Sequence, residues 1–238
     1  LLSARARATM ARTDPAGMKE AVSQLDDFVR SNSNHFRYYE AVGLLGRLYL
    51  AQKDFVQART TYALLGRAPW PDYQMAARIA EARVQLVSGD VDGALAAFEQ
   101  VASAPADDPA ARARHFEALL GKANCLQKKG EHEQAARALD EVIRDVPAEA
   151  TAVQAEAYLR QGDAFLAAGK NTPALLAYLH VELLFPNEED FQPEALYRLS
   201  QLWKIVGRPD RAAETAARLQ TRYPNSEWTK QLTGPAGG

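Results

Sequence analysis

Small and apolar residues recur in a fixed order along this chain. The order is plainest in three stretches: EALLGKANCLQKKGEHEQA (117–135), EAYLRQGDAFLAAGKNTPA (156–174) and EALYRLSQLWKIVGRPDRA (194–212). In each stretch apolar residues fall at the spacing of an amphipathic helix, both before and after a glycine. The pattern predicts pairs of helices joined by a turn, and no sheet.

Five units align when each is started one residue before a recurring alanine. The starts are Glu40, Ala76, Glu117, Glu156 and Glu194. The alanines are Ala41, Ala77, Ala118, Ala157 and Ala195 directly after the starts, and Ala58, Ala94, Ala135, Ala174 and Ala212 eighteen residues after them. Small side chains let two helices approach closely, so we expect these alanines to be buried between helices.

Turn residues separate the two helices of each unit. Thirteen residues after the start stand Lys53, Gly89, Gly130, Gly169 and Gly207. Glycine ends a helix well because it tolerates the left-handed conformation. Lys53 departs from this pattern, and Gln85 stands in a column of large residues. Prolines at the end of each unit are expected to stop the second helix. They are Pro71, Pro105, Pro147, Pro186 and Pro224.

This repeat resembles the tetratricopeptide repeat, a helical hairpin that buries its faces by stacking on its neighbours. The resemblance implies an all-α, right-handed superhelix over residues 1–232, with five clear repeats and one degenerate repeat. The repeats run over about 3–36, 40–72, 76–109, 117–149, 156–188 and 194–226. The degenerate repeat has Ser3 as its start, Ala4, Thr9, Ala21, Leu25 and Phe28 in its columns, and TDPAG as its turn.

Two further segments are interpreted as irregular. SAPADDPAARAR (103–114) is rich in proline, alanine and charge and is predicted to be a surface loop, with a hinge between the two ends of the solenoid as the alternative. The tail TGPAGG (233–238) is expected to be disordered. The chain begins LLSARARATM rather than with Met, as expected of a processed or truncated product.

The forms FPNEEDFQPEALYRLSQLW and RYPNSEW are similar to those of bacterial envelope members of the family. That branch includes periplasmic coordinators of the Tol–Pal system and lipoproteins of outer-membrane assembly. The resemblance favours the periplasm or cell envelope over the cytoplasm.

Composition narrows the function classes. The net charge of −2 argues against a nucleic-acid binder, which usually carries a basic excess. No apolar run approaches the roughly 18 residues of a membrane span. The single cysteine, Cys125, excludes an intramolecular disulfide.

Catalytic and metal-binding patterns are absent from the sequence. His35, His115, His132 and His180 lack the spacing of metal ligands. Cys125 lies within a predicted helix and is expected to be a buried, inert thiol. No glycine-rich phosphate loop follows a strand. The sequence therefore predicts no enzyme, no metal site and no cofactor.

Partner binding is the function that the resemblance implies. The first helix of each repeat would line a concave groove that binds a peptide or partner protein. The groove candidates lie seven residues after each start, with two more in the third unit: Arg47, Arg83, Asn124, Asp163 and Gln201, then Gln127 and Lys128. Asn124 and Lys128 resemble the pair that holds a peptide carboxylate in chaperone-binding members, but the other residues of that clamp do not match.

Three alternatives stay open. The polar column is also what a solvated face gives, with arginine stems covering apolar surface. The chain could instead be a structural subunit of an envelope assembly that makes contact through its convex face, or a regulatory segment of a larger protein.

Arg47 and Arg83 are the candidates with the clearest chemistry. They occupy equivalent places in successive units, so we expect neighbouring, unpaired guanidinium groups on one wall. Unless Glu40 and Glu81 pair with them, an acidic segment of a partner would explain both, because guanidinium binds carboxylates in a two-pronged fashion.

Overall fold

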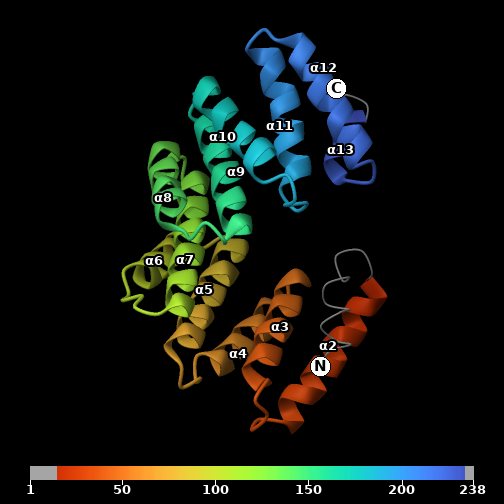
Figure 1. Ribbon diagram of the computed structural model, residues 1–238. Coiled ribbons are helices and arrows are strands. Elements are labelled where there is room, and N and C mark those ends of the chain that lie inside the picture. The colour runs from red at the N-terminus through yellow and green to blue at the C-terminus, as the bar shows by residue number, and fades with distance from the viewer. Residues whose placement is uncertain (1–14, 234–238) are drawn as a thin grey trace. The chain divides into compact units, whose positions relative to one another are not determined.

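The computed structural model describes residues 15–233, and these form twelve α-helices and no strand (Figure 1). The helices are α2 (Pro15–Ser31), α3 (Tyr38–Ala51), α4 (Phe55–Leu65), α5 (Pro71–Ser88), α6 (Val91–Ala102), α7 (Pro109–Lys128), α8 (His132–Asp145), α9 (Thr151–Ala167), α10 (Asn171–Leu184), α11 (Gln192–Ile205), α12 (Pro209–Arg222) and α13 (Glu227–Thr233). The predicted all-α fold is confirmed. The chain divides into two compact units, Leu1–Gly121 and Lys122–Gly238.

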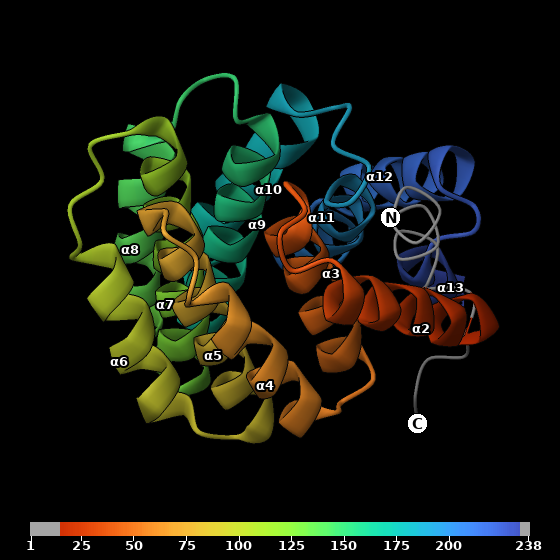
Figure 2. The same ribbon diagram turned by 90° about the horizontal axis from the view of Figure 1, so that it is seen from below.

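In the first unit, helical hairpins stack in chain order. Helices α3 and α4 form one hairpin, and α5 and α6 form the next. Helix α5 packs against α4 as well as α6, and lies between them in Figure 2. Helix α2 packs on α3, in the place of the second helix of the degenerate repeat, and its Ala21 and Leu25 are fully buried.

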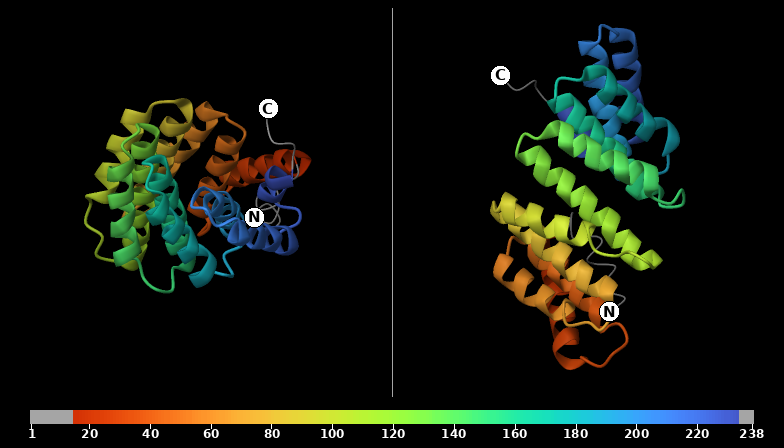
Figure 3. Two further views of the ribbon diagram at one scale, coloured as in Figure 1. Left: turned by 90° about the horizontal axis from the view of Figure 1, so that it is seen from above. Right: turned by 90° about the vertical axis from the view of Figure 1, so that its left-hand side faces the viewer.

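The second unit is built in the same way. Helices α9 and α10 form a hairpin, as do α11 and α12, and α10 packs on α11 (Figure 3). The short helix α13 packs on α11 and α12, and the repeat pattern did not predict it. Ser226 begins α13 by accepting a hydrogen bond from the Thr229 N–H at 3.0 Å, which satisfies one backbone donor of the first turn.

The turns within the hairpins have the backbone conformation that the glycine column requires. Gly89, Gly130, Gly169 and Gly207 all have positive φ, between 73° and 97°. Lys53 occupies the same position in the first clear repeat and also has a positive φ, of 60°. A side chain in this region is strained, so the fold imposes the turn even where the sequence lacks glycine.

Two expectations about helix ends are corrected. Pro71 does not end a helix; it is the first residue of α5, where its missing N–H costs nothing. The segment 103–114 is a loop only as far as Asp108, because α7 begins at Pro109. The Asp108 carboxylate accepts hydrogen bonds from the N–H groups of Ala110 and Ala111, at 2.8 and 2.9 Å, and so starts the helix early.

The two alanine columns form the contacts between helices, as predicted. Each alanine is at most 8% exposed. In two repeats, the glycine six residues after the start lies against an aromatic ring. A Cβ on Gly162 would lie 2.5 Å from Cε1 of Tyr178, and a Cβ on Gly46 would lie 2.3 Å from Cε1 of Tyr62. Glycine therefore lets each ring pack directly against the first helix.

Some predicted features lie outside the described residues. They are Ser3, Ala4 and Thr9 of the degenerate repeat, and the tail beyond Thr233. The other departure in the sequence, Gln85, is half-buried, and its Oε1 has no hydrogen-bond partner in the described part of the chain.

Candidate functional site

The first unit has a cavity of about 220 Å³ on the side of its first helices. It is lined by Tyr39, Glu40, Gly43 and Arg47 of α3, Tyr62 and Leu65 of α4, Tyr73, Ala76, Ala80 and Arg83 of α5, and Arg114 and Glu117 of α7. We call it the Arg47 cavity. Two of the predicted groove residues, Arg47 and Arg83, line this cavity.

The two arginines differ in their partners. Arg83 forms an ion pair with Glu117, with 2.9 Å between Nη2 and Oε1, so the expectation of two unpaired arginines is wrong. The partner of Arg83 is Glu117 of the next repeat, and not Glu40 or Glu81, the two glutamates that the sequence offered as alternatives. Arg47 is exposed, and no side chain in residues 15–233 forms an ion pair with it.

Tyr62 forms part of the inner wall of the Arg47 cavity. It is only 4% exposed, and burial raises the pKa of Tyr62 to about 12, although Arg47 and Arg83 act in the opposite direction. The hydroxyl therefore keeps its proton at neutral pH. It can donate a hydrogen bond to a group that enters the cavity.

Aromatic rings stand beside the cavity. Tyr39 and Tyr73 line it, with 5.7 Å between their ring centroids. The Trp70 ring lies 5.7 Å from Tyr39 and 5.8 Å from Tyr73, and Trp70 is 52% exposed. Arginine, tyrosine and tryptophan are the residues that most often contribute binding energy at protein interfaces.

In the second unit, the groove candidate Asp163 is already bound by other side chains. Its carboxylate accepts hydrogen bonds from Arg160 and from the hydroxyl of Tyr178, both at 2.8 Å. Arg198 approaches Asp163 to 3.5 Å, and Glu194 lies 3.2 Å from Arg160. We call these five residues the Arg160 cluster. Burial lowers the pKa of Arg160, but Glu194 and Asp163 together raise it above its ordinary value.

The other groove candidates of the second unit form no comparable site. Asn124 and Lys128 are exposed on α7, and Gln127 and Gln201 are half-buried. The structure does not bring these four residues together in any cavity that it describes. Their role as groove residues stays a prediction.

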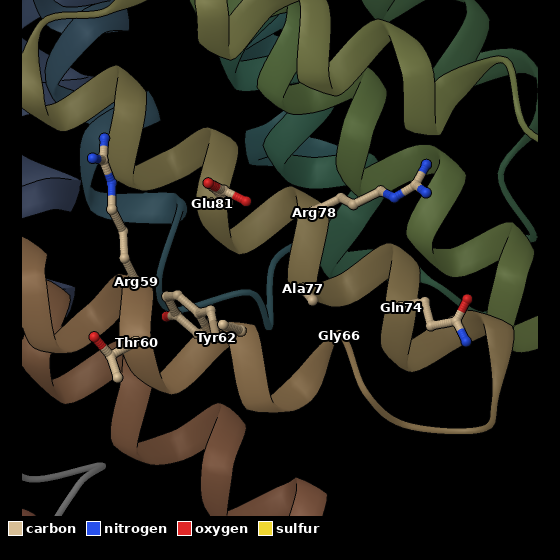
Figure 4. Close-up of a pocket in the computed structure, with 9 residues that line it drawn as sticks. Arg59, Thr60, Tyr62, Gly66, Gln74, Ala77, Arg78 and Glu81 are labelled. Atoms are coloured by element: carbon tan, nitrogen blue, oxygen red, sulfur yellow. The ribbon is translucent and has the colours of Figure 1, made fainter.

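A second cavity of the first unit, of about 460 Å³, lies between α4 and α5. Gly66 and Ala77 lie close together in its lining, and Tyr62 reaches it from α4 (Figure 4). Arg59 and Arg78 extend in different directions there and do not converge on a common point (Figure 4). The two guanidinium groups of this cavity are therefore not placed to bind one acidic group together.

Chemistry elsewhere in the described residues is sparse. Cys125 is fully buried, and burial raises the pKa of its thiol to about 11, so the prediction of a buried thiol is confirmed. Within residues 15–233, no group of three or more His, Cys, Asp and Glu side chains is placed to hold a metal ion. No helix in that range is both long and apolar enough to cross a membrane.

Sequence reasoning missed the residues that complete the Arg47 cavity. Arg83 and Glu117 are 34 residues apart, and the Arg160–Glu194 pair has the same separation. Both pairs join the first helices of successive repeats. An arginine followed by a glutamate 34 residues later in the sequence was the signal that could have identified these two pairs.

Comparison with known proteins supports the repeat assignment. A family model described as "Tetratricopeptide repeat" matches residues 79–150 and 120–187, and another with the same description matches residues 194–226. Together these matches cover more than half of the chain. A comparison with curated protein sequences gave no match.

Solved structures with similar folds are distant in sequence. PilW, a "widely conserved type IV pilus biogenesis factor", is 17% identical with a TM-score of 0.68, over 96% of this chain and 97% of PilW. A Rap protein complexed with competence and sporulation factor is 19% identical with a TM-score of 0.66, over 96% of this chain and 64% of Rap. TTC0263, a tetratricopeptide protein of Thermus thermophilus, is 21% identical with a TM-score of 0.57, over 82% of this chain and 98% of TTC0263. At these identities the likeness concerns the fold alone.

Proposed function

This chain belongs to the tetratricopeptide-repeat family, and from that premise we propose that it is a non-catalytic scaffold that binds a peptide or partner protein. The binding surface is the face of the first unit around the Arg47 cavity. A fold alone does not fix a function, so the proposal depends on the residues of this face.

The Arg47 cavity is the observation that carries the proposal. It combines an exposed arginine without an ion-pair partner in the described residues, a buried tyrosine hydroxyl and a rim of aromatic rings. Such a combination supplies both contact area and directional polar groups. The Rap neighbour, solved with a bound factor, is a precedent for ligand binding on a similar fold.

A matched pair of arginine variants tests this proposal. Partners are first captured from an extract of the source organism, and the dissociation constant of each purified partner is then measured. Arg47→Gln should weaken binding at least tenfold, because a charged hydrogen bond in an interface is worth about 1.5–3 kcal/mol. Arg59→Gln, which changes an exposed arginine at the second cavity, should leave binding within about twofold. Equal effects of the two variants, or no effect of Arg47→Gln, would refute the proposal.

A structural subunit remains the second candidate, because one helix exposes a row of leucines. Leu176, Leu183 and Leu184 of α10 are 53%, 66% and 58% exposed. Leu176 and Leu183 are two turns apart and so share one face of this second helix of a repeat. Leu183→Glu should abolish assembly if this face is an interface, and should leave partner binding unchanged if the Arg47 cavity is the site.

We further propose a compartment. The envelope-type sequence forms support a place in the bacterial cell envelope or periplasm. PilW, a type IV pilus biogenesis factor, shows that this fold also occurs in a protein of pilus biogenesis. Fractionation of the source organism, with antibodies against this chain, tests it. Recovery of the chain in the cytoplasmic fraction alone would contradict it.

A further inference from the structure

The repeat register allows equivalent positions of the two units to be compared. In the second unit, Asp163 stands seven residues after one start, and Arg198 stands four residues after the next start. These side chains meet, with 3.5 Å between Arg198 Nε and Asp163 Oδ1. In the first unit the same two positions hold Arg47 and Ala80. Arg47 therefore carries a charge opposite to that of Asp163, and Ala80 cannot form an ion pair with it. No other side chain among the described residues forms an ion pair with Arg47.

The second ion pair of the cluster is also absent from the first unit. Arg160 and Glu194 occupy positions that correspond to Leu44 and Ala76. Ala76 and Ala80 both line the Arg47 cavity. The space that charged side chains fill in the second unit is therefore open in the first.

The groups around this space include donors for a carboxylate, and they stand beside the carboxylates of Glu40 and Glu117. Arg47 has no ion-pair partner in the described residues, and Arg83 keeps donors besides those facing Glu117, since a guanidinium has five. One arginine can serve two carboxylates in this fold, because Arg160 contacts both Asp163 and Glu194, at 2.8 and 3.2 Å. Tyr62 corresponds to Tyr178, whose hydroxyl donates to Asp163.

We propose that the Arg47 cavity binds the side-chain carboxylate of an aspartate or glutamate in the partner. The carboxylate lies over Ala80, between Arg47 and Arg83, and accepts a hydrogen bond from Tyr62. The partner thereby supplies the acidic group that the repeat supplies to itself in the second unit. This inference rests on the proposed function and names the chemistry of its ligand.

A variant of Ala80 tests the inference by giving the first unit an acidic group of its own. Ala80→Glu adds a carboxylate to the cavity, and Ala80→Gln adds a neutral side chain of the same size. We expect Ala80→Glu to melt at a higher temperature than Ala80→Gln, because only the glutamate can pair with Arg47. Equal melting temperatures, or a lower one for Ala80→Glu, would overturn the inference.

Peptide binding provides the second readout on the same variants. The probes are two pools of eight-residue peptides, identical except that the central residue is glutamate in one and glutamine in the other. Wild type should retain the glutamate pool roughly tenfold more than the glutamine pool, as expected for a charged hydrogen bond. Ala80→Glu should lose this preference. Equal retention of both pools by wild type would overturn the inference.

Nuclear magnetic resonance on the wild-type chain provides a readout that does not depend on the folding of either Ala80 variant. The probes are the α-amide of N-acetylglutamate, the α-amide of N-acetylglutamine, and N-acetylalanine, which carries a terminal carboxylate. The glutamate probe should shift the Nε–H signal of Arg47, and the glutamine probe should not. No shift with the glutamate probe, or an equal shift with N-acetylalanine, would overturn the assignment to an acidic side chain.

The failure of this inference differs from the failure of the proposed function. If Arg47→Gln weakens a captured partner while the glutamate and glutamine pools bind equally, the face binds partners without reading a carboxylate. If Arg47→Gln and Arg59→Gln have equal effects, the face is not the binding surface and both proposals fail.

Discussion

Three glycine-to-alanine variants test the packing of the repeat, because the added methyl group meets a different environment in each. A Cβ on Gly162 would lie 2.5–2.8 Å from three atoms of the Tyr178 ring. Tyr178 is fully buried, and its hydroxyl is held by Asp163 at 2.8 Å, so the ring has little room to move. A Cβ on Gly43 would meet no atom within 4 Å.

The magnitudes follow from two opposing effects. Overpacking a core costs about 1–3 kcal/mol, whereas alanine is favoured over glycine inside a helix by about 1 kcal/mol. Gly162→Ala should therefore lose up to about 2 kcal/mol of unfolding free energy, and Gly43→Ala should gain up to about 1 kcal/mol. For a chain of this length these changes correspond to about 2–4 °C in melting temperature per kcal/mol.

Gly46→Ala tests whether a steric clash destabilises the protein when the aromatic ring that it meets is able to move. Its Cβ would lie 2.3 Å from Cε1 of Tyr62, as tight as at Gly162. Tyr62 borders the Arg47 cavity, however, so its ring can shift into open space. Thermal unfolding followed by circular dichroism should rank stability as Gly43→Ala, then Gly46→Ala, then Gly162→Ala. A stabilised Gly162→Ala variant would refute the reasoning.

Three further predictions concern stability. Lys53→Gly should raise the unfolding free energy by about 0.5–1 kcal/mol, because the strain at φ 60° exceeds the entropy that glycine adds to the unfolded chain; an unchanged urea midpoint would contradict this. Ala135→Arg and Ala174→Arg, at fully buried positions, should each cost at least about 3 kcal/mol, and unchanged melting temperatures would show that the repeat register is wrong. Burial raises the pKa of Glu182 by more than Arg218 lowers it, so the folded protein binds the proton of this carboxyl more tightly than the unfolded chain does. The stability that this proton binding provides at low pH is lost as pH rises through the pKa of Glu182. Glu182→Gln should therefore melt above wild type at about pH 7, with the difference closing towards about pH 4; a pH-independent difference would contradict the sign.

The repeat could be predicted from the sequence because each recurring residue type has a physical cause within its own helical hairpin. An alanine between two helices and a glycine with positive φ can both be recognised from one residue type at one spacing. Lys53 shows the limit of this reasoning. The chain adopts a positive φ at this position although a lysine side chain disfavours that conformation. Pro71 shows another, because proline is compatible both with the end of a helix and with the first turn of one, and its column does not show that Pro71 begins α5.

The candidate site was only partly accessible to sequence reasoning. The register placed Arg47 and Arg83 on one wall, but it did not show that Glu117 takes up Arg83. Nor did it show that Asp163, in the same column, is bound by Arg160 and Tyr178. Which charges remain available depends on contacts between repeats, and a single column does not contain that information.

Site-specific photo-crosslinking tests the central claim most directly. A photoreactive phenylalanine derivative is placed at Tyr73, beside the Arg47 cavity, or at Leu183 on α10, and the chain is irradiated with its partner. We expect crosslinks from Tyr73 to a partner segment that contains aspartate or glutamate, and none from Leu183. Crosslinks from Leu183 alone would contradict the account and favour a structural subunit.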